Sequence, residues 1–183
     1  ISPRHSASSA WWADRFGIGP DTFEAYSFWE RGKGKIWIFN GDAPDPTYPT
    51  LAANGGAYHT VVPTIKLGQL IDSEPDGQPD PAALGDDMNN LPDEDGIVFT
   101  TPIVANNMAT IQVDLTASVG GVLDVWVDYD GSGDWDNATE WAVAGQWLPG
   151  GVMSNLSFSV PATAQPGPTF ARFRFSSTGV TSP

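Results

Sequence analysis

The stretch LDVWVDYDGSGDWDNATE, residues 123–140, combines two sequence patterns that together decide the fold class. In its first five residues, apolar Leu123, Val125 and Val127 are separated by single residues. Such a period of two is typical of a half-buried antiparallel strand. The remainder is rich in aspartate and glycine, which favour turns. The sequence therefore predicts a β-strand that leads directly into an acidic loop.

The same alternation occurs in the segments before and after this stretch. It recurs in residues 111–115, 155–160 and 170–175, and glycine-rich or proline-rich turns separate these segments. Many short alternating strands joined by turns are typical of all-β domains. We therefore predict an all-β protein, an antiparallel β-sandwich of the jelly-roll or immunoglobulin-like type with long acidic loops.

The amino-terminal residues lack a steady period and predict an arm outside the sandwich. We expect residues 1–40 to form this arm and residues 41–183 to form the sandwich domain. The arm ends in a short β-type run that could bind a partner as an added strand. The candidate partner-binding residues are Ile36, Trp37, Ile38 and Phe39.

The acidic loop has the spacing of a cation site. Oxygen-bearing side chains stand at alternate positions from residue 128, and a glycine stands at the sixth position. Alternate oxygens on a tight loop can converge on one Ca²⁺ at about 2.4 Å, and glycine permits the turn. The predicted ligands are Asp128, Asp130, Ser132, Asp134, Asp136 and Glu140. The flanking strand pattern distinguishes the loop from an EF-hand, and an ion-free acidic hairpin is the alternative.

A second acidic region lies between residues 72 and 95. It holds nine carboxylates and no basic residue, so an ordered arrangement would be strongly self-repelling without cations. Acidic loops with proline and glycine can also simply be solvated. The possible further calcium ligands are Asp72, Glu74, Asp76, Asp86, Asp87, Asp93 and Asp95.

The overall charge of the chain limits its partners. The formal net charge is −14, from 22 acidic and 8 basic residues. This charge repels phosphate backbones and anionic lipid, so we expect neither nucleic-acid binding nor membrane insertion. No apolar run approaches the roughly 20 residues that a membrane helix needs. There is no cysteine, which excludes disulfides and thiolate metal sites.

Several motifs in one order resemble the GEVED-domain family of bacterial extracellular and surface proteins. They are GDAPD (41–45), GAYHT (56–60), LG (67–68), DSEPDGQ (72–78), GDD (85–87), DEDG (93–96), the loop 126–135 and TFARFR (169–174). The resemblance covers residues 42–177. It implies a β-sandwich, a secreted or cell-surface location in bacteria and calcium binding, and it implies no catalytic activity.

One segment of that family is absent here. In the family, the arginine-bearing strand is followed by a Gly-Glu-Val-Glu-Asp-Tyr segment, whereas this chain continues with residues 178–183. Either the sequence is cut short, or the sandwich lacks this strand and has an open sheet edge, which is a liability unless it is paired. Because strand donation from copy to copy does not close on itself, an arm added to the next copy would build a filament.

The remaining signals argue against catalysis. The carboxylates have ion-loop spacing, rather than the apolar surroundings that raise the pKa of a general acid, and we expect no enzyme. Four tryptophans near the loop either pack the domain or form a sugar platform: Trp126, Trp135, Trp141 and Trp147. The predicted function is a calcium-stabilised extracellular structural or adhesive domain, with a carbohydrate-binding module of a larger secreted protein as the alternative.

Overall fold

The computed structural model describes residues 18–25, 38–39, 41–71, 76–83 and 96–183. Within these ranges, the regular structure is almost entirely β-strand, and one short 3-10 helix, η1, spans Ala52–Asn54. None of the helical structure in these ranges has the length and apolar character needed to cross a membrane. The predicted all-β class is confirmed.

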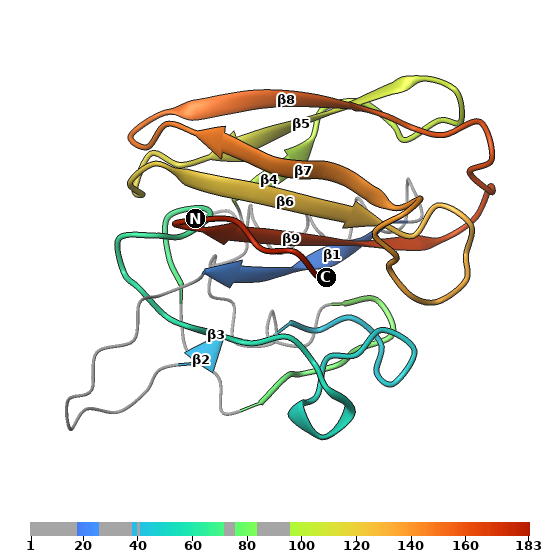
Figure 1. The fold of residues 1–183 in the computed structure, drawn as a ribbon, viewed down its shortest axis with the longest axis horizontal. Helices are drawn as coiled ribbons and strands as arrows, with labels where there is room; N and C mark the ends of the chain where they lie inside the picture. Colours follow the sequence, from blue (N-terminus) through green and yellow to red (C-terminus); the bar gives the residue numbers. More distant parts are fainter. Residues whose placement is uncertain (1–17, 26–37, 40, 72–75, 84–95) are drawn as a thin grey trace, which may run out of the picture.

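Two sheets form the body of the molecule (Figure 1). The first sheet has the order β1-β9-β6-β7, and its strands are β1 (Ile18–Ala25), β9 (Thr169–Ser176), β6 (Gly121–Val127) and β7 (Trp141–Leu148). The second has the order β4-β5-β8, and its strands are β4 (Ile97–Phe99), β5 (Met108–Asp114) and β8 (Met153–Ser159). A small separate ribbon pairs β2 (Ile38–Phe39) with β3 (His59–Thr60).

The core lies between the two sheets and follows the alternation of the sequence. From the first sheet, Leu123 and Val125 of β6 and Phe173 of β9 are fully buried in it. From the second sheet, Ile111 and Val113 of β5 meet them. Burial of large apolar side chains from two facing sheets is the main stabilising term of a sandwich. The predicted sandwich is therefore confirmed.

One strand pair departs from the predicted antiparallel pattern. β1 pairs with β9 in parallel, with Ile18 opposite Thr169 and Ala25 opposite Phe175. All other ladders within the described sheets are antiparallel. Part of the segment predicted to be an arm is thus an edge strand of the first sheet, next to the arginine-bearing strand.

A layer of loops covers the outer face of the first sheet. Ala43 and Tyr48 pack there against Trp126 and Trp135, in a cluster separate from the main core. Arg172 of β9 fastens this layer, because its guanidinium donates to the carbonyl of Pro49 at 2.8 Å and lies 4.3 Å from the ring centroid of Trp135. The first sheet therefore has apolar contacts on both faces, which positions the loop that follows β6.

Candidate metal centre

The acidic loop connects β6 to β7 at one end of the sandwich (Figure 1). Its two ends are held together because the N–H of Val127 donates to the carbonyl of Glu140 at 2.9 Å. The N–H of Asp128 donates to the carbonyl of Phe170 at 3.1 Å, which ties the start of the loop to β9. The first and last predicted ligands thus begin from neighbouring points on a rigid sheet.

Asp128 is the centre of the loop's hydrogen-bond network. Its side chain is buried and accepts hydrogen bonds from the N–H groups of Gly131 at 2.6 Å and Gly133 at 2.9 Å. Both glycines have positive φ, 72° and 89°, a conformation that glycine adopts without a steric penalty. The hydroxyl of Tyr48 donates to the same carboxylate at 2.5 Å. The glycine spacing therefore wraps the backbone around one aspartate.

Glu140 closes the loop from the other side. Its carboxylate is also buried, and it accepts from the N–H of Tyr129 and from the N–H of Asp136, both at 2.9 Å. One carboxylate oxygen from each of Asp128, Asp130 and Glu140 lies within 4.8 Å of the other two. The fold therefore brings three acidic groups to one point.

The two buried carboxyl groups have opposite pKa shifts. Burial alone would raise the pKa of Asp128, but hydrogen bonds from Tyr48 and from loop N–H groups outweigh burial and lower it. Burial raises the pKa of Glu140 to about 7, and the nearby charge of Asp128 adds to this rise. Placing like charges this close disfavours ionisation of one of them. The site is thus electrostatically unfavourable unless positive charge is added.

The donor set fits a calcium ion. Ca²⁺ prefers carboxylate and carbonyl oxygens at about 2.3–2.6 Å, so two ligands of one ion are at most about 5 Å apart. The 4.8 Å limit within the group of Asp128, Asp130 and Glu140 satisfies this condition. A bound cation would neutralise the repulsion between these groups and would favour the ionised form of Glu140.

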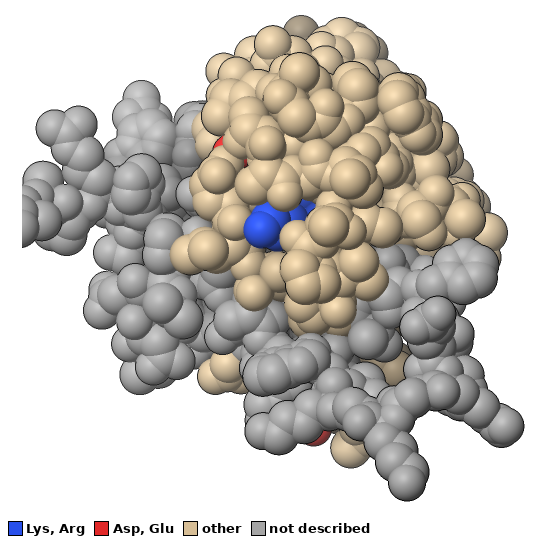
Figure 2. Space-filling model, turned by 90° about the vertical axis from the view of Figure 1, so that its left-hand side faces the viewer, with Lys and Arg blue, Asp and Glu red and all other residues tan. Residues whose placement is uncertain are grey.

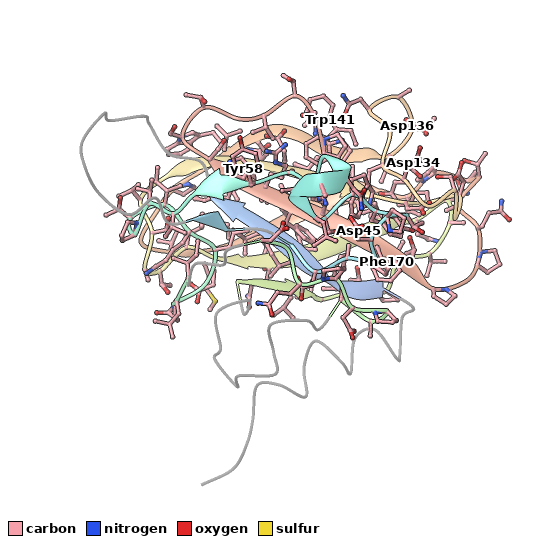
Figure 3. All side chains as sticks on the ribbon, turned by 90° about the horizontal axis from the view of Figure 1, so that it is seen from below. Asp45, Tyr58, Asp134, Asp136, Trp141 and Phe170 are labelled. Atoms are coloured by element: carbon pink, nitrogen blue, oxygen red, sulfur yellow. The ribbon has the colours of Figure 1, made fainter. Side chains whose placement is uncertain are left out.

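The other predicted ligands in the loop have local partners. The carboxylate of Asp136 accepts from the N–H groups of Ala138 and Thr139, both at 2.7 Å, and so caps the turn before β7. Asp134 accepts from the hydroxyl of Ser132 at 2.7 Å. Figure 3 shows Asp134 and Asp136 on this loop at one end of the sandwich. Asp134 and Asp136 therefore lie on the loop but outside the three-carboxylate group.

The sequence patterns did not identify Tyr48 as part of this site. Tyr48 precedes Asp128 by 80 residues, and its ring packs against Trp135 with 4.6 Å between ring centroids. Burial raises the pKa of the Tyr48 hydroxyl, and the hydrogen bond to Asp128 raises it further, so the hydroxyl keeps its proton and acts as a donor. No spacing rule connects residues so far apart, and only the tertiary fold places them together.

The second acidic region is described only in part. The carboxylate of Asp76 accepts from the N–H groups of Ala52 at 2.8 Å and Gly77 at 2.9 Å, and so joins two loops. The other predicted ligands of that region lie outside the described residues: Asp72, Glu74, Asp86, Asp87, Asp93 and Asp95. Of the predicted partner-binding run, Ile38 and Phe39 form β2, whereas Ile36 and Trp37 lie outside the described residues.

Three of the four tryptophans near the loop are packing residues. Trp126 is fully buried and stacks on Trp141, with 5.1 Å between ring centroids and 11° between the ring planes. Trp135 is buried and donates from Nε1 to the carbonyl of Phe170 at 3.1 Å. Trp147, in contrast, is 59% exposed. Trp126, Trp135 and Trp141 therefore offer no free sugar platform.

The comparisons with known proteins assign two parts of the chain. Residues 122–183 match the GEVED domain, which confirms the family indicated by the sequence motifs for the part that contains β6 to β9 and the acidic loop. Residues 3–50 match a family of unknown function, DUF7122. No curated protein and no solved structure matches the chain. The hydrogen bond between Tyr48 and Asp128 joins the two matched regions.

Proposed function

We propose that the chain is a calcium-stabilised structural or adhesive domain of a bacterial extracellular protein, whose copies assemble into filaments. The observation that carries the calcium part is the convergence of Asp128, Asp130 and Glu140 within 4.8 Å at the end of β6. The bond from Tyr48 to Asp128 supports a structural role for the ion. An ion on Asp128 would stabilise the junction between the first sheet and the loop layer that covers it.

The proposed extracellular location agrees with this chemistry. Extracellular domains can bind calcium with millimolar dissociation constants, because the ion is abundant outside cells. A chain without cysteine lacks disulfide crosslinks, so an ion that binds only the folded state would supply the missing stabilisation. The resemblance to the GEVED family implies the same setting. For the alternative, a carbohydrate-binding module, the exposed ring of Trp147 is the remaining supporting feature.

Calcium is expected to raise the melting temperature of the protein. A ligand at 100 times its dissociation constant stabilises the folded state by about 2.7 kcal/mol, which corresponds to roughly 5–10 °C for a domain of this size. Thermal unfolding followed by circular dichroism in calcium, in magnesium and in excess chelator measures the effect. Magnesium demands stricter octahedral geometry and is expected to give the smaller shift. Equal melting temperatures in calcium and chelator would rule out the calcium site.

Filament assembly would use the parallel pair β1 and β9. β1 is the edge strand of the first sheet, and residues 26–37 separate it from β2. The same register, from Ile18 opposite Thr169 to Ala25 opposite Phe175, could form between copies with the backbone hydrogen bonds retained. Donation of β1 to the next copy in one direction is a head-to-tail contact, and such a contact builds an open filament when its rotation does not close a ring.

Removal of residues 1–25 is expected to abolish assembly through this pair. The truncated chain loses the donated strand but keeps β9 as an acceptor, so a separate peptide of residues 1–25 should bind it. Electron microscopy and light scattering on the full and truncated chains measure assembly, and fluorescence anisotropy of the labelled peptide measures binding. A scrambled peptide is the control. If the truncated chain assembled as the full chain does, strand donation would have to be abandoned.

A further inference from the structure

The end of the sandwich opposite the acidic loop carries a group of exposed apolar side chains. We define the apolar pole as Val119, Trp147 and Val152, whose side chains are 50%, 59% and 43% exposed. They lie where β6 begins and where β7 leads into β8. The acidic loop follows the other end of β6. The two ends of the domain thus differ sharply in chemistry.

The residues of the apolar pole belong to two turns that touch each other. The N–H of Leu115 donates to the carbonyl of Val152 at 3.1 Å. A Cβ at Gly150 would lie 2.3 Å from the backbone of Val119, and one at Gly120 would lie 2.9 Å from the Trp147 ring. Two glycines therefore allow this close approach, which places Val119, Trp147 and Val152 together at one end of the sandwich.

Among the described residues, the apolar pole is almost free of charge, although the protein as a whole is strongly acidic. Residues 115–124 and 141–153, which form the two turns and their flanks, contain only one charged side chain, that of Asp124. It is buried and accepts from the N–H groups of Gly145 and Val180. A basic residue lies close by, because the N–H of Lys66 donates to the Ser118 hydroxyl at 3.1 Å. Figure 2 views this end, and its described surface is nearly all uncharged.

We propose that the apolar pole is the contact between two copies of this chain, packed pole to pole. The charge distribution favours this occupant, because two chains of net charge −14 can approach only where little charge is present. The seven residues of β6 separate the apolar pole from the acidic loop by about 23 Å. Screening at physiological salt acts over about 8 Å. Acidic loops at the far ends of such a dimer therefore repel each other weakly.

A head-to-tail contact through the same patch is less favourable. It would bury Trp147 against the acidic loop of the next copy and remove water from exposed carboxylates such as Asp130, which is costly. Pole-to-pole packing instead brings the two Trp147 rings to one two-fold axis, the commonest symmetry of soluble oligomers. Tryptophan is also enriched among the residues that dominate binding energy.

This interface is independent of the proposed calcium site and of strand donation. Trp147 lies on β7, at the edge of the first sheet opposite β1, and at the far end of β6 from Asp128. The pole-to-pole dimer therefore persists in chelator and in variants without calcium ligands. Failure of the dimer leaves the proposed calcium site untouched, and failure of the calcium site leaves the dimer.

Sedimentation velocity of the full chain over a micromolar concentration range tests the proposal. The wild type is expected to form pole-to-pole dimers, which strand donation would link into larger species. Trp147→Glu, which places two new carboxylates at the contact, should raise the dissociation constant of the dimer step at least about tenfold. The matched control is Tyr58→Glu, because Tyr58 is 62% exposed and is not part of the apolar pole. Circular dichroism checks that both variants fold. Raising the salt concentration should not weaken the dimer.

Four outcomes would overturn the proposal. They are a wild type that stays monomeric over the range, equal association of the Trp147→Glu and Tyr58→Glu variants, dissociation of the dimer by salt, and dimers that disappear in chelator. In the first case, saturable binding of a neutral polysaccharide that Trp147→Glu abolishes would assign the patch to a sugar instead.

Discussion

Replacing Asp128 with alanine is expected to destabilise the protein by more than about 3 kcal/mol and to abolish its response to calcium. The substitution leaves the buried Tyr48 hydroxyl and the N–H groups of Gly131 and Gly133 without their acceptor. An unsatisfied buried donor, here the Tyr48 hydroxyl, costs about 1–3 kcal/mol, and each hydrogen bond to a charged group contributes about 1.5–3 kcal/mol. It also removes one of the three converging carboxylates. Urea unfolding in calcium and in chelator measures both effects.

The matched control for this prediction is Asp136→Ala. Asp136 belongs to the same loop and was also predicted as a ligand, but its carboxylate is exposed and caps the turn at Ala138 and Thr139. This variant should lose little stability and keep the calcium response. The role assigned to Asp128 would be refuted if its alanine variant still gained as much stability from calcium as the wild type.

Replacing Trp126 with alanine is expected to cost about 3–5 kcal/mol, the usual penalty for emptying the space of a large buried aromatic side chain. Trp126 is fully buried on the outer face of the first sheet and stacks on Trp141. Its Nε1 donates to the side-chain oxygen of Asn137 at 2.8 Å. The substitution therefore removes the centre of the cluster that holds the loop layer onto the sheet. Chemical unfolding followed by far-UV circular dichroism measures the loss.

Tyr58→Ala is the control for the tryptophan variant, because it removes an aromatic ring that is 62% exposed. Surface substitutions of this kind usually change stability by less than about 0.5 kcal/mol. Limited proteolysis adds a second readout, since loosening of residues 41–59 should make that layer the first part cut in the Trp126 variant. Equal stabilities of the two variants would show that the outer cluster does not hold the layer.

The extent of sequence-based prediction differs between the strands and the site. The alternation at Leu123, Val125 and Val127 identified β6 and the side of it that faces the core. The same pattern marks Trp126 as pointing away from that core, but it did not show that a second apolar layer covers this side. The reason is that alternation reports which face a residue occupies, whereas the partner on that face comes from a distant segment.

For the acidic loop too, the sequence predicts one part of the site and the tertiary structure decides the other. The spacing from Asp128 to Glu140 indicated a group of converging oxygens, and the fold brings Asp128, Asp130 and Glu140 together. The spacing could not distinguish these from Asp136, which faces its own turn. Which oxygens converge depends on the φ angles at Gly131 and Gly133 and on the hydrogen bonds that Asp128 accepts, and a residue pattern does not encode these.

The sequence by itself determined the all-β class, the strands with clear alternation, the acidic loop and the resemblance to the GEVED family, which the family match confirms for residues 122–183. These features depend on residues close together in the chain, where a period of two or a glycine spacing is visible. Only the tertiary structure decided that Tyr48 bonds Asp128, that β1 lies parallel to β9, and that Val119 and Trp147 share one end. Each of these joins distant segments, and their meeting depends on how the whole chain packs.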